Sequence, residues 1–388
     1  MSEKRNTIAI FLASLFSYQI YMAAGLMASM QLWFSHLSGD TVIAMFTMPT
    51  LAQALSALII SPIIGRYSRR LFVILGLLSI SLGGVLIVMG GGASFAVALS
   101  GAILCGIGYS LTLAATNTML VEMYPESAST KVAANCAVGC LGSMFLTTMS
   151  GILARDGVWM RAYILCFPAA IGLILFLLLY RETDRLTVKA DESAEKSSGF
   201  AGSKLLFACV ILVLTLMSFN VASWNTNYSI YVMNEKAIGG TVQTGLMNTL
   251  ASLGGVIGGF FAARLLIPRL KWLMVPVSLL FVALPGVAAA LGCESISVFY
   301  ICSLLFMMFY QPAYAVLSEK AGKLLPGAGV SFITAAAGLG SFVSPYLVNL
   351  LARGAGGRIE TKFAITAAFA IIAALVALPS MKKLESAE

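Results

Sequence analysis

Long apolar runs dominate the sequence, and short polar turns separate them. A helix needs about 20 apolar residues to cross the hydrocarbon core of a bilayer. The pattern therefore predicts twelve membrane-spanning helices in two sets of six. The first set is expected at residues 7–34, 42–64, 71–90, 94–122, 128–153 and 160–180, and the second at 205–232, 242–265, 272–292, 296–319, 328–352 and 361–379.

The longest polar stretch lies between the two sets and runs from Arg181 to Ser203. It mixes charges of both signs with Ser, Gly and Ala, a composition typical of a linker. The predicted organisation has three parts: an N-terminal six-helix bundle at 1–182, a cytoplasmic linker at 183–204 and a C-terminal six-helix bundle at 205–388. The expected fold class is an all-α membrane protein.

The composition supports this class and argues against a soluble protein. Hydrophobic residues make up 59% of the chain, charged residues 10%, and the mean hydropathy is +0.93. A soluble domain carries roughly 25% charged residues because its surface must face water. The seven cysteines form no CxxC pair and no regular framework, so neither disulfides nor a zinc site is expected. No metal and no cofactor are predicted.

The basic residues predict how the helices are oriented. With the N-terminus inside, only six of the 24 Lys and Arg residues fall in outer segments, and 18 fall in inner ones. Cytoplasmic loops retain positive charge, so both termini are expected in the cytoplasm, in a multi-pass protein of the cytoplasmic (inner) membrane. The net charge of +8 is thus assigned to the membrane and not to nucleic acid. A monomer is expected.

The two halves resemble one another at a fixed spacing. Arg66 falls 198 residues before Arg264, and the same offset places Leu141–Ser143 on Leu339–Ser341. Parallel repeats of this kind build one large class of carriers, which hold the cargo between the halves. The predicted bundles are therefore expected to be pseudo-symmetric.

With this repeat and this order of helices, the chain resembles the major facilitator superfamily over nearly its whole length. The family signature G-x-L-x-D-R-x-G-R-R/K corresponds to Ser61–Arg70 and retains three arginines, Arg66, Arg69 and Arg70. The resemblance implies that these arginines form a cytoplasmic gate loop. Gly65 replaces the family aspartate, and serines replace both glycines.

Two further family signatures are incomplete. Span four has Gly106-Ile107-Gly108, but Ala102 stands where the family has arginine. Span five lacks the Gly-Pro signature of drug–proton antiporters between Gly139 and Gly151. The motifs therefore indicate the superfamily without a subfamily.

The expected spans contain neutral polar and aromatic side chains but no charge well inside. Glu122 and Glu319 fall at the inner ends of spans four and ten, where they are expected to pair with basic residues, and the lone His36 falls at an outer end. Charges inside a bilayer mark ion or proton paths. A carboxylate relay within the membrane is therefore not expected.

In the family, spans one, four, seven and ten line the central pathway, so the resemblance implies that polar residues on and beside these spans bind the substrate. Amides donate and accept hydrogen bonds, and aromatic rings offer stacking surface, which suits a small amphipathic molecule. The alternative for each is a bond between helices. The candidates are Tyr18, Gln19, Tyr109, Asn117, Asn220, Trp224, Asn225, Asn248, Tyr310, Gln311 and Tyr314.

The predicted function is a secondary active or facilitative transporter of a small amphipathic organic solute, working by alternating access between the two bundles. An alternative is a transporter or exchanger of organic, monocarboxylate-like anions that uses Arg155 and Arg353 at the outer helix ends. Drug–proton antiport and a receptor without transport also stay open. The sequence holds no HExxH, GxSxG or GxxxxGK[ST] motif, so an enzyme is not expected.

Overall fold

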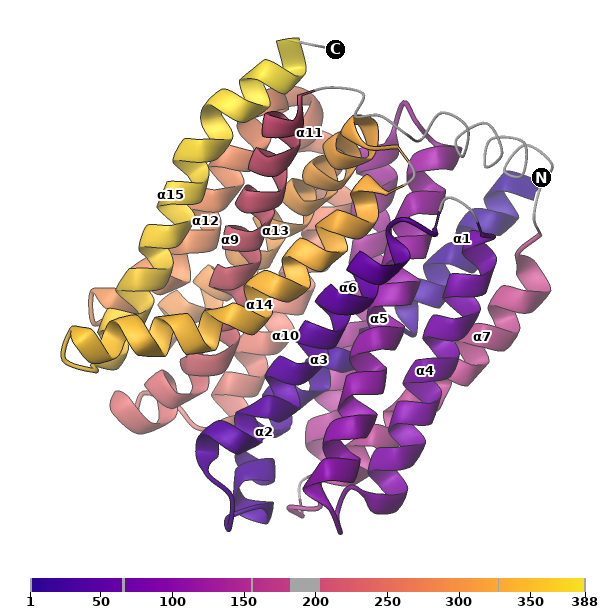
Figure 1. The fold of residues 1–388 in the computed structure, drawn as a ribbon. Helices are drawn as coiled ribbons and strands as arrows, with labels where there is room; N and C mark the ends of the chain where they lie inside the picture. Colours follow the sequence, from indigo (N-terminus) through magenta and orange to yellow (C-terminus); the bar gives the residue numbers. More distant parts are fainter. Residues whose placement is uncertain (1, 65–66, 155, 182–202, 327, 387–388) are drawn as a thin grey trace. The chain divides into compact units, whose positions relative to one another are not determined.

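The computed structural model is helical almost throughout the residues that it describes, which are 2–64, 67–154, 156–181, 203–326 and 328–386. No strand occurs among these residues. Ten helices in the described chain are long and apolar enough to cross a membrane (Figure 1). Most of the predicted linker lies outside the described residues. The hydrophobic pattern therefore predicted the helical membrane class correctly.

The helices follow the expected order along the chain. The first half contains α1 (Ser2–Leu15), η1 (Tyr18–Tyr21), α2 (Met22–Trp33), α3 (Gly39–Ile60), α4 (Arg69–Gly90), α5 (Phe95–Met123), α6 (Ala128–Leu153), η2 (Trp159–Cys166) and α7 (Pro168–Leu179). The second half contains α9 (Lys204–Ile230), η3 (Tyr231–Glu235), α10 (Thr241–Ile257), η4 (Gly258–Ala262), α11 (Ala263–Leu270), η5 (Lys271–Leu273), α12 (Met274–Ala290), α13 (Ile296–Leu324), α14 (Gly329–Gly354) and α15 (Ile359–Ser386).

The first span is interrupted, and the prediction of one helix over 7–34 was wrong. Helix α1 ends at Leu15, and a short 3₁₀ segment, η1, precedes α2. The side chain of Ser17 donates a hydrogen bond to the Ser14 carbonyl oxygen, and the backbone N–H of Ser17 donates to the same oxygen. Serine side chains that bond nearby carbonyls compete with the helical ladder, which accounts for the break.

The stretch Gln243–Ala290 contains 48 residues of continuous helical character. At about 1.5 Å per residue it is long enough for two crossings of a core about 30 Å thick. Lys271, with φ of 48°, ends α11 and turns the chain into α12. The predicted helices 242–265 and 272–292 lie on either side of this turn.

Several helix ends differ from the prediction. Helices α13 and α15 continue to Leu324 and Ser386, past the expected ends at 319 and 379, because lysine, glutamate and alanine favour helix even where the chain turns polar. The predicted helix 160–180 begins with the 3₁₀ segment η2, and α7 starts at Pro168. Proline is tolerated in a first turn because its missing N–H has no intrahelical partner there.

The chain forms two compact units. The first comprises Met1–Ala128, Val138–Gly199 and Pro326–Ala335, and the second comprises Ser129–Ala137, Phe200–Leu325 and Ala336–Glu388. The start of α6 thus belongs to the second unit, and the start of α14 belongs to the first. These two helices are each divided between the units.

The same helix pairings occur in both units. In the first unit α4 packs on α5, α3 on α5, and α1 on α7. In the second unit the corresponding pairs are α12 with α13, α10 with α13, and α9 with α15, the last pair lying side by side in Figure 1. These pairings are those that the internal repeat requires.

Two glycines that the repeat matches make equivalent contacts. A Cβ atom on Gly142 of α6 would lie 2.1 Å from the Leu15 carbonyl oxygen of α1. A Cβ atom on Gly340 of α14 would lie 2.2 Å from the Thr215 carbonyl oxygen of α9. Both contacts are backbone to backbone, so only glycine fits. Small residues at such positions let membrane helices approach closely.

Glycines four residues apart on α10 and η4 pack against one neighbouring helix. Cβ atoms on Gly254 and Gly258 would lie 2.1 and 2.3 Å from the carbonyl oxygens of Leu304 and Met308 on α13. The segment η4 is a π-helix, whose wider turn changes the facing of the residues after it. Gly259, within this segment, faces α6, where its Cβ would lie 2.2 Å from the Ala133 carbonyl oxygen.

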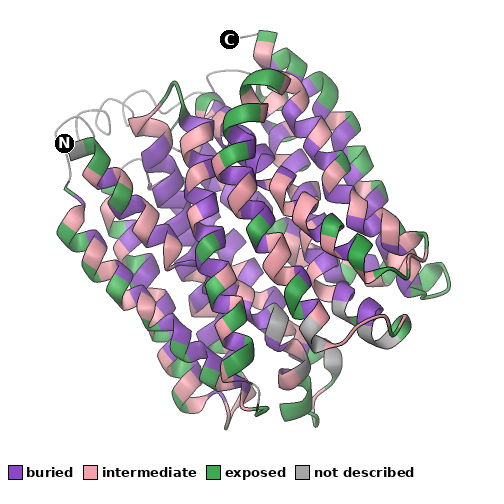
Figure 2. Ribbon diagram, turned by 180° about the vertical axis from the view of Figure 1, so that it is seen from behind, coloured by how far each residue is buried: buried purple, intermediate pink, exposed green. Residues whose placement is uncertain are grey.

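Helices such as α4 bury one side and expose apolar residues on another, and buried and exposed segments alternate along many ribbons in Figure 2. Leu32, Leu178, Leu205 and Leu375 are more than half exposed although they are fully apolar. In a soluble protein so much exposed leucine would drive association. Here the exposed faces suit contact with lipid.

We expect Gly142→Ala to destabilise the protein, because the new methyl group would meet the Leu15 backbone and force α6 away from α1. Overpacking of this kind costs about 1–3 kcal/mol. Gly151→Ala on the same helix is the matched control, since a Cβ there meets nothing within 4 Å. Thermal unfolding in detergent should show a lower Tm for Gly142→Ala only. Equal Tm values for both variants would contradict this packing.

Candidate functional site

The interruption of the first helix is stabilised by Gln19. In a continuous helix the Phe16 carbonyl would accept the amide of residue 20, four positions ahead. Here the Gln19 Nε2 atom donates to the Phe16 carbonyl oxygen at 2.8 Å. Gln19 is 1% exposed, and its Oε1 atom has no hydrogen-bond partner among the described residues. Irregular backbone at membrane depth requires such compensation.

Three tyrosines lie together beside this break. The ring of Tyr18 meets the ring of Tyr109 of α5 edge-on with centroids 5.2 Å apart, and Tyr21 meets Tyr109 at 5.8 Å. The hydroxyl oxygens of Tyr21 and Tyr109 are 3.2 Å apart. Such edge-to-face pairs contribute beyond their buried area. The structure thus brings two predicted residues, Tyr18 and Tyr109, together and adds Tyr21.

Gly139 of α6 holds the ring of Tyr18 in place. A Cβ at Gly139 would lie 2.1 Å from the Tyr18 Cε2 atom, so the ring rests directly on the helix backbone. Further along α5, Asn117 is fully buried, and Ser14 of α1 donates to the Thr116 hydroxyl at 3.4 Å. A buried polar layer therefore continues from the break along α5.

In the second unit, Asn220 of α9 bonds a neighbouring helix. Its Nδ2 atom donates to the Thr366 carbonyl oxygen of α15 at 2.9 Å, and the hydroxyls of Ser223 and Thr366 are 3.1 Å apart. All three residues are buried. Asn220 therefore takes part in the helix–helix bonding that was the alternative for every polar candidate. The sequence did not predict Thr366 as a site residue, because nothing in its alanine-rich surroundings marks it as a hydrogen-bonding partner.

Trp224, one turn beyond Asn220, packs in an aromatic cluster. Its ring centroid lies 5.6 Å from that of Tyr228, 5.9 Å from Phe299 and 5.6 Å from Phe363. Its side chain is 5% exposed. These contacts join α9, α13 and α15 at one level.

Helix α13 carries the remaining aromatic candidates. Tyr310 is half-buried, with its hydroxyl 3.4 Å from the Ser218 hydroxyl of α9, and its ring is stacked with Tyr314 at 6.2 Å. Gln311 and Tyr314 are buried. Asn225 on α9 and Asn248 on α10 are half-buried. The second unit thus offers a tyrosine pair beside a hydroxyl.

The predicted basic residues have different environments. Arg66 and Arg155 lie outside the described residues. Arg353 is exposed, and Arg70 is half-buried at the start of α4. Arg69 is buried, and its Nη2 atom lies 2.7 Å from the Glu122 carboxylate at the end of α5.

The expected pairing of the two helix-end acids is confirmed. Glu122 bonds Arg69, and the carboxylate of Glu319 lies 2.8 Å from the Lys323 amine. Glu319 also accepts the amide N–H of Ser129, in the first turn of α6, at 3.1 Å. A carboxylate at a helix start satisfies an otherwise free N–H and matches the helix dipole.

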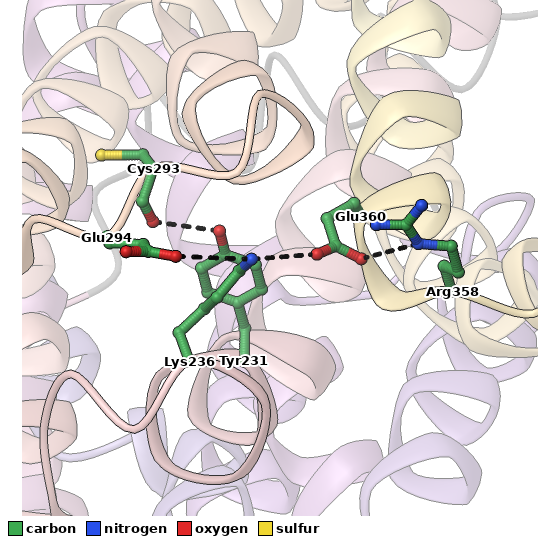
Figure 3. A network of polar contacts seen from close by, with 6 residues as sticks. All are labelled: Tyr231, Lys236, Cys293, Glu294, Arg358 and Glu360. Atoms are coloured by element: carbon green, nitrogen blue, oxygen red, sulfur yellow. Dashed lines mark hydrogen bonds and ion pairs between the residues drawn. The ribbon is translucent and has the colours of Figure 1, made fainter.

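A network at one end of the second unit was not predicted (Figure 3). Lys236 lies 3.2 Å from the carboxylate of Glu360 and 3.9 Å from that of Glu294, and Arg358 lies 3.7 Å from Glu360. The Tyr231 hydroxyl donates to the Cys293 carbonyl oxygen at 3.0 Å. The network joins the segment after α9, the α12–α13 turn and the start of α15. It escaped prediction because these loops are far apart in sequence.

Apolar helices with buried neutral polar clusters define a multi-pass membrane protein. The family model described as the Major Facilitator Superfamily matches residues 9–345, and the chain belongs to this family. No curated protein sequence matches the chain.

Solved transporters share the fold. The crystal structure of the human organic anion transporter MFSD10 (TETRAN) has a TM-score of 0.74 and 16% identity, covering 97% of this chain and 100% of MFSD10. The proton:xylose symporter XylE bound to 6-bromo-6-deoxy-D-glucose has a TM-score of 0.69 and 15% identity, covering 96% and 94%. A double-tryptophan variant of XylE gives 0.70 and 16%, covering 98% of each chain. Identities this low establish the fold alone.

We expect Lys236→Met to lower the Tm, because it leaves Glu294 without this cation and Glu360 with Arg358 alone. The Lys236 side chain is 20% exposed. The loss in unfolding free energy should therefore lie between that of a surface ion pair and that of a buried one, at about 1–2 kcal/mol. Lys236→Arg should restore most of it. Arg161→Met is the control, since its pair with Asp156 is more than half exposed on both sides. A Tm unchanged in Lys236→Met would show that the network contributes nothing to stability.

Proposed function

We propose that this protein is a secondary active or facilitative transporter of a small amphipathic organic solute. It works by alternating access between two six-helix bundles, residues 1–182 and 205–388, joined by a cytoplasmic linker at 183–204. The observation that carries the proposal is the buried set of tyrosines and amides at the broken first helix. Discontinuous helices form binding sites in several classes of transporter.

The proposed topology has twelve crossings with both termini in the cytoplasm, in a cytoplasmic membrane. The ten long helices, the interrupted first helix and the double length of Gln243–Ala290 support this count. The excess of inner Lys and Arg supports the orientation. Arg66, Arg69 and Arg70 are assigned to the cytoplasmic gate loop, with Arg69 anchored by Glu122.

Substrate binding is assigned to neutral residues. Tyr18, Tyr21 and Tyr109 offer aromatic edges and hydroxyls in one unit, and Tyr310, Gln311 and Tyr314 offer them in the other. We assign no proton relay within the membrane, because Glu122, Glu319 and Glu360 are held in ion pairs at helix ends. Asn117, Asn225 and Asn248 remain assigned to the site as polar contacts, whereas Asn220 and Trp224 shape it through their neighbours.

A thermal-shift screen of the detergent-purified protein tests this proposal. The panel holds neutral amphipathic metabolites, organic acids, sugars and lipophilic drugs, each at two pH values. A ligand present at 100 times its Kd stabilises the folded state by about 2.7 kcal/mol. We expect stabilisation by neutral amphipathic compounds, equal at both pH values, and transport of the same compounds into proteoliposomes.

Tyr109→Phe should weaken binding of these compounds several-fold, because it removes the hydroxyl that meets Tyr21. Tyr67→Phe is the matched control, since Tyr67 is 57% exposed and lies between α3 and α4. Stabilisation by carboxylates alone, stronger at low pH, would instead indicate an anion carrier linked to protonation.

The anion alternative predicts a role for the outer arginines. Under our proposal, the double variant Arg155→Gln with Arg353→Gln keeps its affinity for the compounds found in the screen, because neutral cargo does not need these charges. Arg161→Gln is the control for a general change in outer charge. A loss of affinity in the double variant only, measured by the same thermal shift, would favour the organic anion.

A further inference from the structure

One buried acceptor in the first unit lacks a donor. Gln19 is 1% exposed, and its Oε1 atom accepts no hydrogen bond from the described residues. An unsatisfied acceptor inside an apolar environment is costly, and buried polar groups normally find partners. The position of this oxygen therefore calls for a donor that the described part of the chain does not supply.

The orientation of the Gln19 amide is fixed by its other atom. Nε2 lies 2.8 Å from the Phe16 carbonyl oxygen, which can only accept. Turning the amide over would place two oxygens against each other and free the carbonyl left by the helix break. Oε1 is therefore held as an acceptor and cannot exchange its role with the nitrogen.

Two buried hydroxyls without a partner have a simpler explanation. Among the described residues, the hydroxyls of Ser278 and Ser303 have no partner, but each sits inside a continuous helix, where a change of side-chain rotamer can direct it to a carbonyl one turn back. Gln19 Oε1 has no such choice, because it can only accept and therefore cannot bond a carbonyl. Its neighbour Tyr18 adds an aromatic surface on the same short segment.

We infer that Gln19 Oε1 accepts a hydrogen bond from the cargo, and that the cargo carries a hydroxyl or N–H donor beside an apolar or aromatic body. The inference rests on the proposed transport function and narrows its substrate class. A site built around a buried acceptor rejects analogues that lack the donor, because the acceptor is then left unpaired. A carboxylate anion would present a second acceptor and be disfavoured.

Matched pairs of compounds test this requirement in the purified full-length protein. The probes are 2-phenylethanol and its methyl ether, phenylacetamide and N,N-dimethylphenylacetamide, and phenylacetate as the anion. The members of each pair share the aromatic body, and methyl groups replace the donor hydrogens in the second member. We expect wild-type protein to bind the donor members roughly five-fold more tightly by thermal shift, as one neutral hydrogen bond predicts.

The variant Gln19→Met removes the acceptor and should abolish the preference within each pair. Gln31→Met on α2 is the control, since Gln31 is exposed, and it should keep the preference. If Gln19→Met does not fold, the preference of the wild-type protein within each pair of probes is the test. Equal binding of both members by wild type, or a preference that persists in Gln19→Met, overturns the inference and leaves the transporter proposal intact. Binding of phenylacetate alone, or of no probe, contradicts the proposed cargo class as well.

Discussion

Backbone polar groups inside the hydrocarbon core must find their partners within the protein, and this requirement organises the structure. Lipid tails offer no hydrogen bonds, so an interrupted helix exposes carbonyls that another group must satisfy. Gln19 does this at the first helix, where its Nε2 atom replaces the lost backbone donor to Phe16. Asn220, which follows Gln19 by 201 residues and lies on α9 of the second unit, instead bonds the Thr366 carbonyl of α15. The same residue chemistry thus supports a break in one unit and a helix pair in the other.

Close helix contact is the second consequence of a lipid environment. Between membrane helices the hydrophobic effect gives little attraction, so packing and small residues hold them together. Gly142 and Gly340 place a backbone directly on the carbonyls of Leu15 and Thr215. These contacts leave no room for a side chain at either position. Under the proposed alternating access, such contacts would hold neighbouring helices of one unit together.

The sequence predicted most of the fold because length and hydropathy alone determine which segments can cross a membrane. The break at Phe16–Tyr21 was not predictable, since the apolar pattern runs through it and only Ser14 and Ser17 hint at it. The sequence also did not predict what each buried polar residue contacts. Whether an asparagine lines a pathway or bonds a neighbour depends on the rotation of its helix, which hydropathy does not encode. Trp224 illustrates this, because its partners Phe299 and Phe363 come from helices distant in sequence.

Charged pairs and neutral polar clusters lie at different places among the described residues. Arg69 with Glu122, Glu319 with Lys323 and the Lys236 network all lie at helix ends, where water and headgroups reduce the cost of charge. Under the proposed function, the neutral tyrosines and amides would recognise cargo by hydrogen bonds and ring contacts without desolvating an ion. The proposal would then place energy coupling at the ends of the helices. A charged pair at a helix end can be made in one conformation and broken in another, whereas the neutral layer can remain unchanged throughout.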